Sequence, residues 1–145
     1  MKTKILIVNA NYYREISSGL LAAAQLTFDM RSTSKVKYSI INVPGIFEIP
    51  VVISKHIKKY DGFVALGCII KGETPHFDYI CKSTFHAIMS LSIEHKKPIG
   101  NGIITCLNIN QASTRSSNNV HKKNRGTEAA RAVLSVLGIL KHESR

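Results

Sequence analysis

The sequence predicts an α/β protein with a doubly wound, mainly parallel sheet. Strand-like apolar runs alternate with segments of helical apolar spacing, in the order β-α-β-α-β-α-β-α. One central run, Phe63–Ile70, is apolar throughout, which is typical of a strand buried on both faces. Because crossovers between parallel strands are right-handed, helices should cover both sides of the sheet. These observations predict a three-layer αβα, flavodoxin-like fold around a four-stranded parallel sheet.

The first half of the chain is expected to contain two strands and two helices. Ile5–Val8 is a short run of strand-forming residues, and residues 15–30 carry apolar side chains near helical spacing. Val36–Val43 is β-branched and partly alternating, as in a strand. Pro50 suits the first turn of the next helix, because its missing N–H costs nothing there. We expect this helix to run to about Lys59.

The second half adds two strands and further helices. Phe63–Ile70 is the third strand, and glycines at positions 100 and 102 weaken the prediction of the fourth. Asn108 and Gln111 have the spacing of a helix N-cap. The remaining predicted elements are a helix from about His76 to His95, a strand over Ile99–Cys106, a short helix opened by Asn108 and an apolar helix over 127–140.

Length and composition limit the possible classes of protein. The 145 residues fit one domain over 1–145, and a hydrophobic content of 44% excludes intrinsic disorder. No apolar stretch reaches ~18 residues, so we expect no transmembrane helix, and the N-terminal residues do not resemble a signal peptide. The formal net charge of +11 is compatible with binding to a nucleic acid, a membrane surface or a phosphorylated small molecule.

Cysteine usage and histidine spacing argue against disulfides and metals. The three cysteines are an odd number without C-x-x-C spacing, so we expect neither a disulfide framework nor a structural zinc site. Asp78 and His86 could join His76 as ligands, but their spacings match no ligand pattern, and we expect no metal. The cysteines are by default small buried residues. A reducing, cytoplasmic location follows as an expectation.

The fold class predicts where a ligand should bind. In open α/β sheets ligands bind beyond the carboxyl ends of the strands. This rule selects four loops, at residues 9–14, 43–48, 68–76 and 105–110. Together their side chains could bind a flat polar heterocycle and move protons on it. The candidate residues in these loops are Tyr12, Tyr13, Phe47, Glu48, Lys71, Gly72, Thr74 and His76.

Several of these residues also have simpler interpretations. His76 could bond nearby backbone at a helix start, although its titration range makes it the best general acid–base candidate. Glu48 could favour the positive end of its helix, and Phe47 and Tyr12 could be ordinary core or rim aromatics. The basic stretch 115–125 is either a solvated loop or an anion site, and it lacks the interleaved aromatics of nucleic-acid binding.

Three segments of the sequence are the most distinctive. Residues 43–50 read VPGIFEIP, residues 66–79 read LGCIIKGETPHFDY, and residues 124–130 read NRGTEAA. In order, they resemble the motifs V-P-G-A-F-E-I-P, L-G-x-x-I-R-G-x-T-x-H-F-D-Y and N-K-G-x-E-A-A of the lumazine synthase family. This family acts at the penultimate step of riboflavin biosynthesis. Its fold, a four-stranded parallel sheet between helices, agrees with the fold predicted above.

The resemblance implies a reaction. It condenses 5-amino-6-(D-ribitylamino)uracil with 3,4-dihydroxy-2-butanone 4-phosphate to give 6,7-dimethyl-8-ribityllumazine, phosphate and water, without a cofactor. Imine formation, phosphate elimination, ring closure and dehydration all need proton transfer. Proximity of the two bound reactants should supply much of the acceleration, and a histidine acid–base the rest.

The resemblance also implies roles by position. His76 matches the family's catalytic histidine. The residues implied to lie beside the pyrimidine and its ribityl chain are Tyr12, Ile46, Phe47, Glu48, Cys68, Ile69, Ile70 and Asn101. The residues implied to lie beside the phosphate-bearing substrate are Gly72, Glu73, Thr74, Arg115 and Arg125, of which the two arginines come from a neighbouring subunit in the family.

Some positions depart from the family pattern. Residues 11–13 read NYY where most members have Arg-Phe-Asn, which keeps an aromatic. Asn101 replaces a phenylalanine that covers the pyrimidine from the next subunit, and Lys71 replaces an arginine, keeping the charge without the planar fork. These departures leave open a flavin- or lumazine-binding protein with little catalysis, and the basic surface leaves open nucleic-acid binding.

The resemblance further implies self-assembly. Family members form pentamers, decamers of two pentamers or sixty-subunit shells. A ring is a closed heterologous assembly, which suits a site shared between neighbours. Few residues precede the first predicted strand, so we expect a short N-terminal arm and a pentamer or decamer. The expected partners are the small-molecule substrates and further copies of the chain, with no nucleic acid and no membrane.

Overall fold

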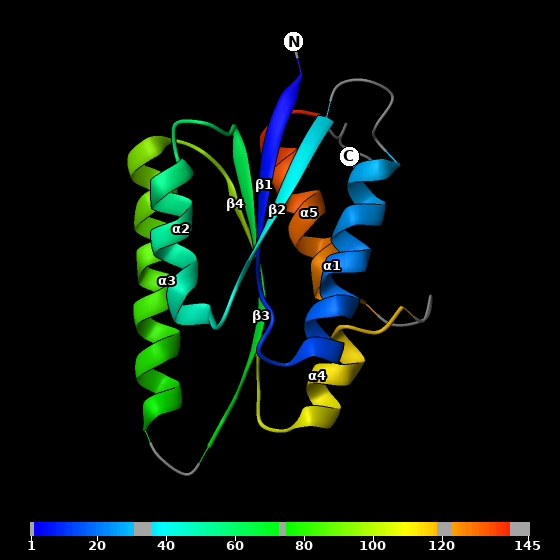
Figure 1. The fold of residues 1–145 in the computed structure, drawn as a ribbon, viewed down its shortest axis with the longest axis vertical. Coiled ribbons are helices and arrows are strands. Elements are labelled where there is room, and N and C mark those ends of the chain that lie inside the picture. The colour runs from blue at the N-terminus through cyan, green and yellow to red at the C-terminus, as the bar shows by residue number, and fades with distance from the viewer. Residues whose placement is uncertain (1, 31–35, 73–74, 119–122, 140–145) are drawn as a thin grey trace, which may run out of the picture.

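The computed structural model describes residues 2–30, 36–72, 75–118 and 123–139. At its centre lies a sheet in the order β2-β1-β3-β4, in which every neighbouring pair of strands is parallel. Figure 1 shows helices on both sides of this sheet. The predicted three-layer α/β fold with a four-stranded parallel sheet is therefore confirmed. The strands are β1 (Thr3–Ala10), β2 (Val36–Val43), β3 (Gly62–Ile70) and β4 (Ile99–Cys106).

One face of the sheet is covered by α1, α4 and α5. Successive side chains of a strand point to opposite faces, and Ile5 and Ile7 of β1 point to this one. They pack in one apolar cluster with Leu20 and Phe28 of α1 and with Leu134 of α5, all fully buried. The bounds of these helices are Arg14–Asp29 for α1, Ile109–Arg115 for α4 and Arg125–Val136 for α5.

The other face is covered by α2 and α3. Leu6 and Val8 of β1 point to this side and join a second apolar cluster with Ile49 and Ile53 of α2 and Ile88 of α3. The bounds of the two helices are Ile49–His56 for α2 and His76–His95 for α3, and a short 3-10 turn, η1 (Ile46–Glu48), precedes α2. The two clusters together make the core, with the sheet between them.

The prediction for β3 holds in detail. Phe63 and Ala65 belong to the cluster under α2 and α3, whereas Val64 and Leu66 belong to the cluster under α1 and α5. All four side chains are completely buried. The uninterrupted apolar run therefore reflects a strand that is covered on both faces.

The glycines of β4 strengthen the packing instead of weakening the strand. A Cβ on Gly100 would meet the backbone carbonyl of Ala129 in α5, and a Cβ on Gly102 would lie 2.5 Å from Leu66 Cδ2. The two glycines thus let α5 approach the sheet closely. Ile99–Cys106 forms the predicted strand because the packing gained here outweighs the low strand preference of glycine.

Two helix ends differ from the prediction. The helix expected to reach about Lys59 ends at His56, where the Ile57 N–H bonds the Ser54 carbonyl three residues back, at 3.4 Å, and tightens the last turn. The helix expected over 127–140 spans Arg125–Val136. It ends because Gly138 adopts a left-handed conformation with φ of 78°, a common helix terminator.

No helix in the described part of the chain combines the length and the apolar character needed to cross a bilayer.

Candidate active site

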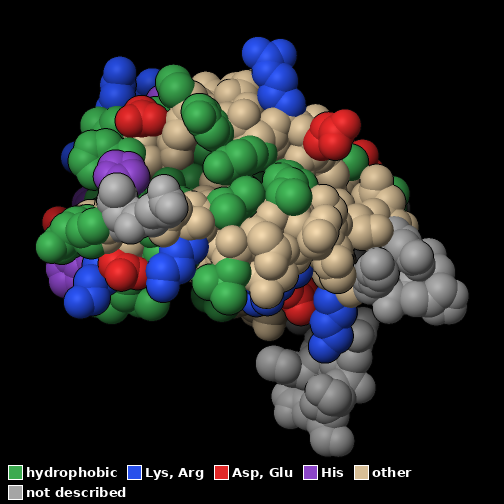
Figure 2. Space-filling model, turned by 90° about the horizontal axis from the view of Figure 1, so that it is seen from below, with side chains coloured by type: hydrophobic (Ala, Val, Ile, Leu, Met, Phe, Trp, Pro, Cys, Tyr) green, Lys and Arg blue, Asp and Glu red, His purple; other side chains and the backbone are tan. Residues whose placement is uncertain are grey.

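The four predicted loops lie together because parallel strands all end at one edge of the sheet. Backbone hydrogen bonds continue slightly beyond the strands there: Asn11 N–H donates to the Val43 carbonyl at 3.0 Å, and Lys71 N–H donates to the Cys106 carbonyl at 2.9 Å. Figure 2 views the molecule from this end and shows apolar, basic, acidic and histidine side chains on the same face. The site is therefore built on rigid strand ends.

Tyr12 stands out from the surface at the end of β1. Its side chain is 74% exposed, and its ring meets Tyr13 edge to face, with centroids 5.0 Å apart and an interplanar angle of 83°. Tyr13 packs against the core at the N-cap position of α1, and burial raises the pKa of its hydroxyl. A fixed tyrosine thus supports an exposed one, whose face is open for stacking.

The segment Ile46–Glu48 forms the η1 turn beside the end of β3. Ile46 is buried, and a Cβ on Gly67 would lie 2.9 Å from its Cγ2, so the missing side chain lets the turn rest on the strand. Phe47 is 61% exposed and Glu48 is half-buried. Both line a cavity of about 410 Å³ between α2 and α3, which Ser83, Thr84 and Ala87 of α3 complete.

The end of β3 supplies backbone and no reactive thiol. Cys68 is buried, whereas Ile69 and Ile70 are half-buried at the point where the strand reaches the surface. Burial raises the pKa of Cys68 to about 12, and the neighbouring Cys106 adds to the effect. Because the thiolate is the nucleophile, Cys68 is not a nucleophile near neutral pH. Gly72 is exposed, and nothing in the described residues lies within 4 Å of where its Cβ would be, so a ligand can approach its backbone from that side.

His76 is the first residue of α3 and is exposed at the site end of the molecule. Pro75 precedes it at the N-cap position, and Asp78 lies in the same first turn. The sequence prediction of a helix from His76 to His95 is confirmed to the residue. The predicted site residues Glu73 and Thr74 lie outside the described residues.

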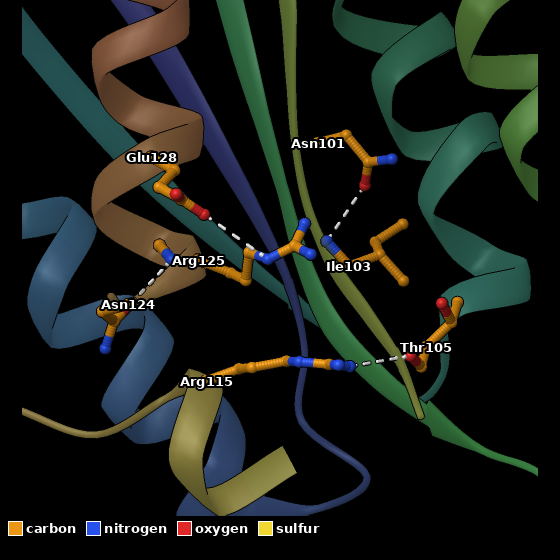
Figure 3. Close-up of polar contacts among 8 residues, drawn as sticks. Asn101, Ile103, Thr105, Arg115, Asn124, Arg125 and Glu128 are labelled. Atoms are coloured by element: carbon orange, nitrogen blue, oxygen red, sulfur yellow. Dashed lines mark hydrogen bonds and ion pairs between the residues drawn. The ribbon is translucent and has the colours of Figure 1, made fainter. Parts of the chain in front are cut away.

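A second group of predicted residues forms a separate pocket, which we call the cation pocket. Its volume is about 540 Å³, and Arg115 at the end of α4 donates from a terminal nitrogen to the Thr105 carbonyl at 3.1 Å. Arg125 Nε lies 3.4 Å from Glu128 Oε1 in the first turn of α5. Figure 3 shows both guanidinium groups extending toward β4. The residues that line the cation pocket are Thr114, Arg115, Lys123, Arg125 and Glu128.

The start of α5 is held by Asn124, which is buried. Its side-chain oxygen accepts from Gly126 N–H at 2.7 Å, and its side-chain nitrogen donates to the carbonyls of Gly19 and Ser117, each at 3.2 Å. The same residue therefore caps α5 and ties it to α1 and to the segment after α4. This arrangement fixes the backbone from which Arg125 extends.

Asn101 lies on the outer edge of β4, which is an edge strand of the sheet. Its side-chain oxygen accepts from the Ile103 N–H of its own strand at 3.0 Å (Figure 3). Arg115 satisfies the Thr105 carbonyl on the same edge. Side chains of this chain thus occupy backbone groups that a neighbouring strand would otherwise pair with.

The structure brings the predicted residues together in two groups and not in one. His76, Phe47 and Glu48 belong to the side of the sheet that carries α2 and α3, and Tyr12 follows β1 at the same end. The cation pocket is formed by α4, α5 and the segment before α5, on the other side (Figure 1). We call the first group, with Ile46, Ile69, Gly72 and the backbone of Cys68 and Ile70, the histidine half-site, although the side chains of Cys68 and Ile70 pack on the α1 and α5 side of the sheet.

Glu128 and Thr114 belong to the cation pocket and were not predicted from the sequence, whereas Lys123 lies in the basic stretch 115–125 that was considered as an anion site. Glu128 could have been found, because residues three apart on a helix are neighbours and it follows Arg125 at that spacing. Within the described residues, no three His, Cys, Asp or Glu side chains are grouped as metal ligands would be.

Comparisons with known proteins match this chain to one family. The family model described as 6,7-dimethyl-8-ribityllumazine synthase matches residues 2–141. Several relatives are named 6,7-dimethyl-8-ribityllumazine synthase. The relative from Bartonella bacilliformis is 43% identical, over 94% of this chain and 90% of the relative. The relative from Corynebacterium kroppenstedtii is 36% identical, over 95% of this chain and 85% of the relative. The relative from Agrobacterium fabrum is 37% identical, over 97% of this chain and 96% of the relative. The chain therefore belongs to the 6,7-dimethyl-8-ribityllumazine synthase family.

Proposed function

We propose that this protein is an enzyme that condenses 5-amino-6-(D-ribitylamino)uracil with 3,4-dihydroxy-2-butanone 4-phosphate, giving 6,7-dimethyl-8-ribityllumazine, phosphate and water in riboflavin biosynthesis. Membership of the family supports this reaction. The observation that carries it furthest in the structure is the placement of an exposed histidine, an exposed aromatic and a half-buried carboxylate at one end of the sheet, from α3, β1 and η1. The proposed reaction uses no cofactor and no metal.

In this proposal the histidine half-site binds the pyrimidine. Tyr12 stacks on the pyrimidine ring, and Tyr13 holds the Tyr12 ring in place by the edge-to-face contact. The backbone of Cys68–Ile70 hydrogen-bonds the ring edge where β3 ends. The ribityl chain lies along Ile46–Glu48, where the Glu48 carboxylate accepts hydrogen bonds from its hydroxyls. Such polar groups fix the orientation of a ligand that apolar surfaces bind.

The cation pocket binds the phosphate. Arg115 and Arg125 supply charge-assisted hydrogen bonds, which are the stronger kind for a phosphate acceptor. Gly72, Glu73 and Thr74, which follow β3 in the sequence, are proposed to contact the butanone phosphate. The excess positive charge of +11 thereby has one assigned partner, a phosphorylated substrate.

His76 acts as the general acid and base. The 5-amino group of the pyrimidine attacks the butanone carbonyl, water leaves to form the imine, and phosphate is then eliminated. Ring closure and a final dehydration complete the lumazine. A single histidine suits all of these steps, because an imidazole ring can both accept and donate a proton. Holding the two reactants side by side supplies much of the remaining acceleration.

We further propose a homo-oligomer, a pentamer or a decamer, with each active site between two subunits. The separation of the two groups supports it, since the histidine half-site and the cation pocket lie on opposite sides of the sheet in one chain. A ring repeats a heterologous contact, in which one side of a subunit meets the other side of the next. That contact would set the cation pocket and Asn101 of one copy against the histidine half-site of another.

We propose the cytoplasm as the location of the enzyme. The three cysteines are all unpaired, as is usual in a reducing compartment.

One assay tests the proposed function. Purified protein with both substrates should generate the fluorescent lumazine, and omission of either substrate should abolish the signal. The assay should also be run with riboflavin titrated into the protein. Tight riboflavin binding without turnover would contradict the enzyme and favour a binding protein, and an absence of product under any substrate ratio would contradict the reaction.

A further inference from the structure

The cation pocket contains a carboxylate, which is unexpected in a site for an anion. Three cationic side chains and Glu128 line it. Arg125 and Glu128 have side chains that are 48% and 47% exposed, and their ion pair joins Nε to Oε1 at 3.4 Å. The pair is therefore open to solvent and to competition by another anion.

The two arginines of the pocket are held in different ways. Arg115 donates to the neutral Thr105 carbonyl, so its positive charge is not offset by this partner. Arg125 is held by a negative partner, which offsets part of the charge that it offers to a ligand. The contact with Glu128 is made at Nε, and in Figure 3 the terminal nitrogens point away from Glu128 and toward β4. A phosphate could therefore reach the terminal nitrogens while Glu128 stays in place.

We propose that Glu128 is a positioning residue that acts through Arg125: it holds the guanidinium by Nε and lowers the affinity of the cation pocket for phosphate. This inference rests on the proposed function, in which the pocket binds the phosphorylated substrate and phosphate is a product. A pocket with three cations and no acid would retain inorganic phosphate after each turnover. Glu128 weakens that binding and favours release, because its negative charge offsets part of the positive charge that Arg125 offers to phosphate.

An ordinary structural role for Glu128 makes a different prediction. An acidic residue in the first turn of a helix, paired with a base three residues away, stabilises the helix by a small amount. In that case, removing the charge would lower the melting temperature slightly and leave phosphate affinity unchanged. The two roles therefore separate when phosphate binding is measured directly.

The experiment compares Glu128→Gln with the parent, with Glu128→Asp and with the control Glu94→Gln. Glu94 Oε2 lies 3.8 Å from His95 Nε2 in the last turn of α3, at the end of the helix opposite to His76. Inorganic phosphate is titrated into each protein by calorimetry, and its inhibition of lumazine formation is measured in parallel. We expect Glu128→Gln to bind phosphate about fivefold more tightly, which corresponds to about 1 kcal/mol. Glu128→Asp keeps the charge and should stay within about twofold of the parent, as should Glu94→Gln.

Two further measurements distinguish an effect of Glu128 through Arg125 from a direct electrostatic effect of Glu128 on phosphate. In Glu128→Gln the KM for the butanone phosphate should fall by a similar factor, while the KM for the pyrimidine stays unchanged. In a background of Arg125→Gln, the additional change Glu128→Gln should alter phosphate affinity by less than about twofold.

Phosphate affinity that is unchanged or weaker in Glu128→Gln would overturn the inference. A tightening that is as large without Arg125 as with it would overturn the assigned route. If no variant makes lumazine, the proposed function fails, and the calorimetric titration still decides whether Glu128 weakens phosphate binding.

Discussion

The histidine half-site and the cation pocket are built in different ways. Tyr12 and Phe47 are 74% and 61% exposed and extend from strand ends and a short turn. In the cation pocket, Arg115 is bonded to the Thr105 carbonyl and Arg125 is paired with Glu128. One region thus offers open aromatic surface, and the other offers charges that are already held in place. The proposed site between two subunits would bring these two kinds of surface together, with aromatic surface on one side and fixed charges on the other.

The largest expected effect is on the histidine half-site. His76→Ala should lower kcat by about 10²-fold, the usual size of a general acid–base contribution. The KM values for both substrates should change little, because the histidine moves protons and does not carry the binding contacts. Steady-state kinetics with each substrate varied in turn measures this. An unchanged kcat would remove His76 from its proposed role and leave the histidine half-site without its chemistry.

The next effect is on the cation pocket. Arg115→Ala should raise the KM for the butanone phosphate by about tenfold or more, since a hydrogen bond to a charged group contributes about 1.5–3 kcal/mol. The KM for the pyrimidine should stay the same, in contrast to a change in the histidine half-site. If Arg125→Ala alone produced this effect, the phosphate would be held by α5 and not by α4.

A pair of glycines tests how rigidly each region is held. Gly100→Ala should lower the free energy of unfolding by about 1–3 kcal/mol, because its Cβ would meet the Ala129 carbonyl and force α5 away from β4. The matched change Gly72→Ala adds a Cβ where nothing lies within 4 Å and should have little effect on stability. Urea denaturation measures both. If the Gly100→Ala and Gly72→Ala variants had the same free energy of unfolding, this would contradict the close packing of α5 against β4 that supports the cation pocket.

The smallest effect concerns stacking at Tyr12. Tyr12→Leu should raise the KM for the pyrimidine by about two- to tenfold, since an aromatic contact contributes about 0.5–1.5 kcal/mol. Tyr12→Phe keeps the ring and serves as the control, with an unchanged KM. If both variants lost the same affinity, the hydroxyl and not the ring face would be the contact.

Much of the fold follows from local patterns in the sequence. The uninterrupted apolar run of β3 predicts burial on both faces, and the alternation of strands and helices predicts the layers. The same patterns give wrong predictions at positions where tertiary contacts or special backbone conformations determine the secondary structure. Gly100 is a poor strand residue by preference, yet the sheet requires it because α5 packs against it. Gly138 ends α5 earlier than the apolar spacing predicted, because its left-handed conformation stops the helix.

The sequence names candidate site residues, but it does not contain their arrangement in space. The rule for strand ends finds Tyr12, Phe47 and His76 without knowledge of their neighbours. The division into two groups depends on which side of the sheet each helix covers, and spacing along the chain does not contain this. Glu128 was missed because a carboxylate is not sought in a site for an anion. Its partner Arg125 and the spacing of three residues are the signals that reveal it.

In the proposed assembly, the histidine half-site of one subunit works with the cation pocket of another. This arrangement is tested by mixing two variants, His76→Ala and a second with both Arg115→Ala and Arg125→Ala, after unfolding and refolding them together. Native mass spectrometry establishes that mixed oligomers form, and lumazine synthesis is measured at low butanone phosphate.

Each variant alone should be nearly inactive. In a random equal mixture, about a quarter of the subunit contacts join an intact histidine half-site to an intact cation pocket, so activity should recover to about that fraction of the parent. Mixed oligomers that remain as inactive as the separate variants would contradict this arrangement and place the whole site within one chain.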